Sequence, residues 1–130
     1  MRTLLASLAV GSLALGLTAC GGSDSNNGDT PTVTVKAGQP VHVVASEYKF
    51  RPADIVVEGG GATKFELKND GSLAHNLRVK ENGSDIGGTP TLQNGETKAA
   101  TVQLRTGTYT LVCTIGDHES LGMTAQLTVK

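Results

Sequence analysis

Apolar and polar side chains alternate with a period of two over most of the chain after Thr32, as in Phe65-Glu66-Leu67. β-Branched residues occur in short runs that are bounded by Gly, Asn, Asp and Pro. Because a strand turns successive side chains to opposite faces, this pattern predicts an all-β domain. The expected strands cover residues 32–36, 41–48, 54–58, 63–69, 75–80, 97–104, 108–115 and 123–130. Seven to eight short strands predict a β-sandwich or barrel.

Residues 81–96 interrupt this alternation. The segment is rich in glycine and other turn-forming residues, and it is long for a loop within a compact domain. We therefore expect no strand there, but a connection that crosses between the sheets.

The N-terminus carries an uncharged apolar segment, Leu4 to Ala19, behind a single basic residue, Arg2. As a helix it would span about 24 Å, short of the roughly 30 Å hydrocarbon core of a bilayer. The segment is typical of a secretory signal peptide, residues 1–19. Its end, Leu17-Thr18-Ala19-Cys20, resembles the lipobox of bacterial lipoproteins, which implies cleavage before Cys20 and a lipid anchor on that thiol. The alternative is ordinary cleavage that leaves Cys20 as a free or disulfide-bonded thiol.

Residues 20–31 are Gly-, Ser-, Asn- and Asp-rich and lack apolar periodicity, which indicates a flexible tether. The remaining segment, 32–130, is the expected folded domain. We thus expect an exported protein of the cell envelope, at the periplasmic face or the cell surface, held to the membrane through Cys20.

Length and composition restrict the function classes. The chain has 130 residues and a net charge of -1, with two Phe, two Tyr and no Trp. One domain of this size leaves no room for a multidomain enzyme, and a near-neutral chain with few aromatic rings is a poor nucleic-acid binder. Active-site triads and phosphate-binding glycine motifs do not occur in the sequence.

Three residues with metal-binding side chains extend the inward-facing phases of expected strands. His75 is in phase with Leu77 and Val79, Cys113 with Tyr109 and Leu111, and Met123 with Ala125 and Leu127. Each residue alone is explained by core packing or a turn, but together they predict one cluster at neighbouring strand ends. His42 has no such pattern and is expected on a strand surface.

The segment from Cys113 to Met123 places four residues between Cys113 and His118, and four more between His118 and Met123. One Cys, two His and a weakly bound Met are the ligands of a blue-copper electron-transfer centre. Structural zinc sites usually have four Cys or His ligands, so zinc fits less well. The sequence therefore predicts one copper ion bound by His75, Cys113, His118 and Met123.

At these residues the chain resembles the cupredoxin (type I blue copper) family, over about residues 41–130. The resemblance rests on Phe50-x-Pro52-x-x-Ile55-x-Val57-x-x-Gly60, on Asn69 followed by His75-Asn76, and on the loop from Cys113 to Met123. The loop spacing is most similar to the rusticyanin and sulfocyanin branch. The resemblance implies a Greek-key β-sandwich, with Met123 as the axial ligand and the backbone N–H of Asn76 pointing at the thiolate.

Four ligands leave no open coordination position, so we expect an electron carrier and not an enzyme, with no small-molecule substrate. The resemblance implies that the edge of His118 is the electron port, with apolar neighbours and a redox partner such as a cytochrome c or a terminal oxidase. The candidate docking residues are Leu73, Ala74, Ile115, Leu121 and Gly122. Asp117 and Glu119 either steer a basic partner or serve as solvated loop residues.

Two other functions stay open at this point. A copper storage or delivery lipoprotein is one, although such carriers often use several exposed Met residues and Met123 is the only one after residue 19. A metal-free β-sandwich that serves as an interaction module is the other.

Overall fold

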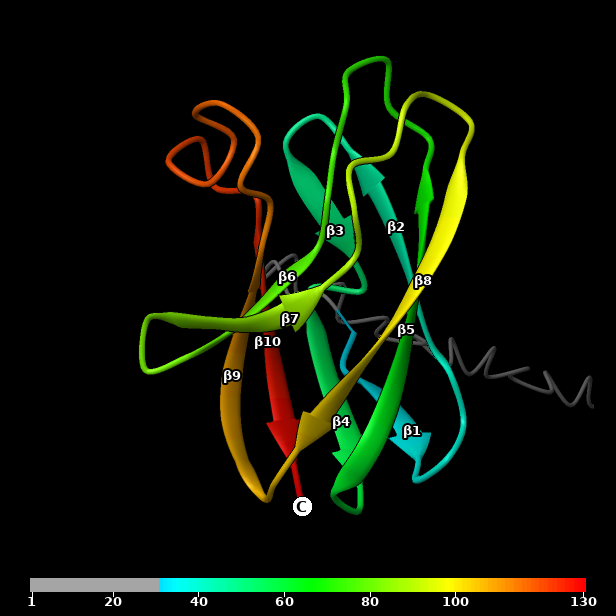
Figure 1. Cartoon of the computed structure of the whole chain (residues 1–130), viewed down its shortest axis with the longest axis vertical. Coiled ribbons are helices and arrows are strands. Elements are labelled where there is room, and N and C mark those ends of the chain that lie inside the picture. Colours follow the sequence, from blue (N-terminus) through cyan, green and yellow to red (C-terminus); the bar gives the residue numbers. More distant parts are fainter. Residues whose placement is uncertain (1–30) are drawn as a thin grey trace, which may run out of the picture.

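Two β-sheets packed face to face form the described part of the protein (Figure 1). The computed structural model describes residues 31–130, which form ten strands. These are β1 (Val33–Lys36), β2 (Val41–Ser46), β3 (Lys49–Arg51), β4 (Asp54–Glu58), β5 (Gly61–Asn69), β6 (Arg78–Glu81), β7 (Ser84–Gly88), β8 (Thr97–Leu104), β9 (Gly107–Val112) and β10 (Thr124–Val129). No helix long and apolar enough to cross a membrane occurs within this part of the chain.

The strand order shows a sandwich in which the chain passes repeatedly between the sheets. One sheet has the order β1-β4-β10-β9-β6-β7 and the other has the order β3-β2-β5-β8. β4 pairs in parallel with both β1 and β10, and β2 pairs in parallel with β5, so these neighbours are joined by crossovers and not by hairpins. The predicted all-β Greek-key sandwich is confirmed, with ten strands among the described residues in place of seven to eight.

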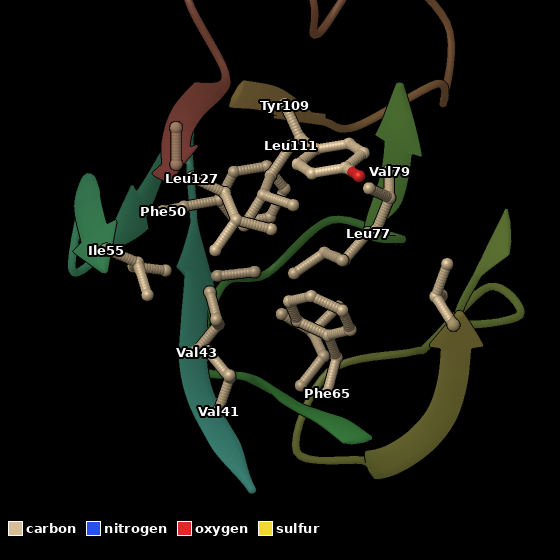
Figure 2. Packing of buried hydrophobic residues seen from close by; sticks show 14 of the residues in the cluster. Val41, Val43, Phe50, Ile55, Phe65, Leu77, Val79, Tyr109, Leu111 and Leu127 are labelled. Carbon is tan, nitrogen blue, oxygen red and sulfur yellow. The ribbon is translucent and has the colours of Figure 1, made fainter. Parts of the chain in front are cut away.

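The core lies between the sheets and follows the predicted alternation. In β5 the side chains of Thr63, Phe65, Leu67 and Asn69 are buried while their neighbours face outward. Figure 2 shows side chains of both sheets, among them Val43, Phe65 and Leu111, gathered in the space between the strands. Burial of one such Val, Leu or Phe side chain contributes roughly 1.5–3 kcal/mol, so this interior holds the two sheets together.

The expectation of no strand within residues 81–96 was wrong, because β7 occupies Ser84–Gly88. β7 pairs with β6 at the edge of its sheet. A Cβ on Gly88 would collide with the carbonyl oxygen of Leu77 and lie 2.8 Å from Cα of Arg78, so glycine permits this close approach. Gly88, one of the glycines that argued against a strand, therefore allows the pairing of β7 with β6. The rest of the segment crosses to β8 in the other sheet, as expected.

The expected strand boundaries were too long around the candidate ligands. β6 begins only at Arg78, β9 ends at Val112 and β10 begins at Thr124. His75, Cys113 and Met123 thus lie just outside regular strands, on the connections at one end of the sandwich (Figure 1). The expected strand 41–48 also ends early, at Ser46, where a turn leads into the unexpected short strand β3.

The predicted signal peptide, the lipidation site Cys20 and the tether up to residue 30 lie outside the described residues.

Candidate metal centre

Three of the four predicted ligands converge on one point in the interior. His75, Cys113 and His118 are all buried, and their candidate ligand atoms lie within 4.8 Å of one another. Sγ of Cys113 is 3.8 Å from Nδ1 of His75 and 3.5 Å from Nδ1 of His118. Both imidazoles therefore turn the same ring nitrogen toward one sulfur atom.

Met123 completes the loop that begins at Cys113. Its side chain is fully buried. Its backbone carbonyl accepts a hydrogen bond from the N–H of Cys113 at 3.2 Å, and its N–H donates to the carbonyl of His118 at 3.0 Å. The fourth predicted ligand is thereby tied through its backbone to the two other ligands on the same loop.

The loop between them is built from tight backbone turns. The N–H of His118 donates to Ile115, that of Leu121 to Asp117, and that of Gly122 to Glu119. These short-range bonds fold the eleven-residue span from Cys113 to Met123 without a strand partner. The loop geometry thus depends mainly on contacts within the loop itself.

His75 is fixed in a different way, by the body of the protein. Its backbone forms a two-way bridge with Leu92, at 3.0 and 2.7 Å. The preceding connection is held by the buried side chain of Asn69, whose amide donates to the carbonyls of Leu73 and Leu92 while its oxygen accepts from the N–H of Gly71. Because every polar group of this amide has a partner, the burial of Asn69 is compatible with a stable fold.

A carboxylate, Glu47, contacts the far side of the His75 ring. Oε1 of Glu47 lies 3.2 Å from Nε2 of His75 and accepts the backbone N–H of Leu73 at 2.7 Å. The Leu73 hydrogen bond is the main cause that lowers the pKa of Glu47 below its ordinary 4.5; partial burial acts in the opposite direction, and the contact with His75 lowers the pKa further. The sequence analysis missed Glu47, since it lies in the turn after β2, 28 residues before His75, where no periodic pattern identifies it.

Asn76 joins the two ligand segments through its side chain. Its amide donates to the hydroxyl of Thr114 at 2.8 Å, and its side-chain oxygen accepts the backbone N–H of Thr114 at 2.8 Å. Thr114 directly follows Cys113, so this pair of bonds connects the ligand loop to the residue after His75. The predicted contact between the backbone N–H of Asn76 and the thiolate stays a prediction.

Exposed apolar side chains come from the same end of the sandwich as the ligands. Leu73 is 43% exposed and Leu121 is 51% exposed, while His118 retains 7%. Ile115, also predicted for this surface, is partly buried and packs against the core. The ring of Tyr48, 37% exposed, meets the His118 ring edge-on with centroids 5.0 Å apart. Sequence reasoning missed Tyr48, which like Glu47 lies in the β2–β3 turn.

Charges near the ligand loop are partly neutralised. Both carboxylate oxygens of Glu119 lie 2.9 Å from Nζ of Lys80. Glu119 is therefore poorly suited to steer a basic partner, and Asp117 is left as the candidate. His42 lies on the outer face of β2, where Nδ1 is 3.3 Å from Oε1 of Glu66, in agreement with its expected place on a strand surface.

The donor set fits a single metal ion of the type I copper class. With a metal–sulfur distance of about 2.3 Å and metal–nitrogen distances of about 2.0–2.1 Å, as for zinc, ligand angles between tetrahedral and trigonal separate S from N by about 3.5–3.8 Å. The two Sγ–Nδ1 distances of 3.8 and 3.5 Å match that separation. Two imidazole nitrogens and one thiolate suit copper, and buried Met123 adds a soft thioether.

Comparison with known proteins agrees with the fold. A family model described as the cupredoxin-like domain matches residues 9–129. A search of curated proteins found no significant match. The structure is similar to auracyanin A, a "blue" copper protein from Chloroflexus aurantiacus, with 19% identity and a TM-score of 0.60 over 77% of this chain and 100% of the other.

Two further structural neighbours differ in size. Rusticyanin from Thiobacillus ferrooxidans is 21% identical, with a TM-score of 0.59 over 75% of this chain and 82% of that one. The Cu-containing nitrite reductase from Thermus scotoductus SA-01 is 20% identical, with a TM-score of 0.53 over 75% of this chain but only 28% of the other. At these identities the likeness shows a shared fold.

Proposed function

Since this chain belongs to the cupredoxin family, we propose that it is a type I blue copper protein that carries single electrons between redox proteins at the cell envelope. The observation that carries the proposal is the convergence of two buried Nδ1 atoms on the buried Sγ of Cys113. A copper ion, when bound, supplies reversible one-electron chemistry between Cu(I) and Cu(II).

Four side chains of this chain are the proposed ligands of such an ion. His75, Cys113 and His118 would supply the three close ligands, and the thioether of Met123 would supply a weaker fourth. Both histidines have Nδ1 directed at the sulfur, and the four proposed ligands are buried, with only His118 keeping 7% exposure. A buried cage of this kind changes little between two oxidation states, which favours electron transfer over chemistry on a bound substrate.

The reductase neighbour does not favour an enzymatic function for this chain. This chain covers only 28% of the length of the copper-containing nitrite reductase. Among the described residues, the only group that gathers three metal-binding side chains is His75, Cys113 and His118. We therefore propose a carrier with one copper ion and no catalytic role.

The surface around His118 is the proposed docking surface for the redox partner, which we define as Tyr48, Leu73, Leu121 and the exposed edge of His118. Leu73 and Leu121 are exposed apolar side chains, and the exposed ring of Tyr48 contacts the ring of His118. A cytochrome c or a terminal oxidase is the proposed partner, and the membrane attachment proposed at Cys20 would keep the carrier near it.

The first experiment tests copper binding itself. Residues 21–130, which omit the predicted signal peptide and Cys20, are titrated with Cu(II) while the visible spectrum is recorded. We expect an intense copper–thiolate charge-transfer band that Cys113→Ser and His118→Ala abolish. His42→Ala, which removes an exposed histidine, is the matched control and leaves the band unchanged.

Two outcomes would contradict the proposal. Tight copper binding without the charge-transfer band would favour storage or delivery of the metal. Absence of copper binding in a folded chain would favour the metal-free interaction module.

A second experiment tests the docking surface. Leu121→Asp should slow the reduction of the copper protein by a cytochrome c, because a charge would replace an apolar side chain on the ligand loop. Val33→Asp is the control, since Val33 is 40% exposed on β1, away from the ligand loops (Figure 1). Equal rates for the two variants would exclude Leu121 from the docking surface.

A further inference from the structure

Glu47 makes two polar contacts with one carboxylate oxygen, and both contacts lie next to the metal centre. Oε1 lies 3.2 Å from Nε2 of His75 and accepts the N–H of Leu73 at 2.7 Å. The His75 side chain is fully buried, whereas 31% of the Glu47 side chain is exposed. The carboxylate therefore stands between solvent and the buried imidazole.

The two nitrogens of His75 face opposite partners. Nδ1 faces Sγ of Cys113 at 3.8 Å, and Nε2 faces Glu47. An ionised carboxylate only accepts hydrogen bonds, so Nε2 must carry a proton for this contact to be favourable. In the neutral imidazole, Nδ1 then keeps its lone pair, which is the form that binds a metal.

The chain leaves space for this carboxylate at Gly71. A Cβ at that position would collide with Oε1 of Glu47 and would lie 2.9 Å from Nε2 of His75. Gly71 has no positive φ that would by itself call for glycine. The absence of a side chain there is thus explained by the close approach of Glu47 to His75.

The two ligand histidines differ in this respect. The neighbour from the β2–β3 turn that meets His118 is the uncharged ring of Tyr48. His75 instead meets a negative charge, held in place by the backbone N–H of Leu73. Hydrogen bonds of this kind orient a metal-binding histidine and raise its basicity.

We propose that Glu47 is a positioning residue of the metal centre. It holds His75 in the tautomer in which Nδ1 carries no proton, and its negative charge favours Cu(II) over Cu(I). This inference rests on the proposed copper function. The first part follows from hydrogen bonding, and the second follows because a nearby negative charge stabilises the more highly charged ion.

Two variants separate these two parts. Glu47→Gln removes the charge but keeps an oxygen that accepts from both His75 and Leu73. Glu47→Ala removes the charge and the acceptor together. Glu66→Gln is the matched control, because Glu66 contacts His42 at a similar 3.3 Å on the outer face of the sheet.

The first measurement needs no metal. The ¹⁵N chemical shifts of the imidazole nitrogens of metal-free protein report which nitrogen carries the proton. We expect a single His75 tautomer protonated on Nε2 in the wild type, in Glu47→Gln and in Glu66→Gln, and a mixture of tautomers in Glu47→Ala.

The second measurement uses the copper-loaded protein. Glu47→Ala should bind Cu(II) about 10- to 100-fold more weakly, the usual effect of losing such a partner of a metal ligand. Glu47→Gln should shift the preference for Cu(I) over Cu(II) by about tenfold, equivalent to a rise of about 59 mV in reduction potential. Glu66→Gln should change neither quantity.

Failure of the inference and failure of the proposed function look different. If the wild type forms the copper–thiolate band but the Glu47 variants match Glu66→Gln in tautomer and potential, the inference is overturned and the function stands. If the folded wild type binds no copper, the proposed function is overturned, and the inference falls with it.

Discussion

His75 and His118 turn the same nitrogen toward the same sulfur, yet their surroundings differ. His75 has no exposed surface and is held by groups from elsewhere in the fold: the backbone of Leu92, the connection pinned by Asn69, and Glu47. His118 keeps 7% exposure and sits on a loop folded by its own backbone turns, with the Tyr48 ring at its edge.

The difference separates two requirements of the proposed electron carrier. A ligand anchored in the scaffold fixes the position of the ion, and a ligand near solvent shortens the path to a partner. If this comparison is right, changes around His75 should affect the stability of the fold and the geometry of the metal site. Changes around His118 should be tolerated, or a small molecule from solvent should be able to replace the missing group.

The largest expected effect comes from removing each ring. His75→Gly and His118→Gly should each lower copper affinity by more than about 100-fold, since loss of a ligand exceeds the usual effect of losing its hydrogen-bond partner. Added imidazole should restore the charge-transfer band of His118→Gly, because the gap opens near the surface. His75→Gly should stay colourless at the same imidazole concentration, and equal rescue of both variants would contradict the comparison.

The next effect concerns the side chains that hold the two connections. Asn69→Ala removes three buried or partly buried hydrogen bonds and should lower the free energy of unfolding by about 3 kcal/mol. Ser120→Ala removes one exposed bond to the carbonyl of Asp117 and should cost at most about 0.5 kcal/mol. Urea unfolding of the metal-free variants measures both, and similar losses would show that the two regions are equally anchored.

Replacing one glycine near each histidine with alanine should give a smaller difference between the two regions. Gly71→Ala places a methyl group against Glu47 and His75, and it should cost about 1–3 kcal/mol and alter the copper spectrum. Gly116→Ala meets open space at a φ of +50°, so it should cost about 1 kcal/mol through backbone strain alone. The expected spectrum of Gly116→Ala is that of the wild type; a shifted spectrum would show that the His118 loop is as tightly constrained as the His75 region.

The smallest effect lies outside both regions and serves as a reference. Arg78 forms a two-pronged ion pair with Asp85 between β6 and β7, and this hydrogen bond is the main cause that lowers the pKa of Asp85 below its ordinary 3.8. A carboxyl group whose pKa is lower in the folded than in the unfolded state stabilises the fold at pH values above its unfolded-state pKa. This stabilisation is lost as the pH falls through the folded-state pKa.

The pair is well exposed, so its contribution is at most about 1 kcal/mol. Wild type should therefore exceed Asp85→Asn in urea midpoint at pH 7, and the difference should shrink below about pH 3.8. A difference that persists undiminished at pH 2 would exclude this ion pair as its cause.

Much of the fold was predictable because strands with one buried face show alternating apolar and polar residues in the sequence. β4 and β8 occur at the expected residues, 54–58 and 97–104, since alternating side chains there face one core. β7 and β3 were missed for physical reasons: the first is glycine-rich at an edge, and the second is three residues long.

The candidate site divides in the same way. His75, Cys113 and Met123 were identified because each continues the inward phase of a neighbouring strand, and all three are buried. Glu47 and Tyr48 act from a turn, where side-chain direction depends on tertiary contacts and leaves no periodic signal. Their roles required the three-dimensional arrangement.

The spacing of the ligands also bears on the unfolded chain. Cys113, His118 and Met123 lie within one short segment, whereas His75 is 38 residues from Cys113. After denaturation the segment retains three neighbouring donors, so the denatured ensemble keeps some affinity for copper. The metal raises the melting temperature only to the extent that it binds the native state more tightly than the denatured state. Copper should thus stabilise the protein less than its dissociation constant from the native protein implies. The difference between the two measures the affinity that the denatured segment retains without His75 and a preformed site.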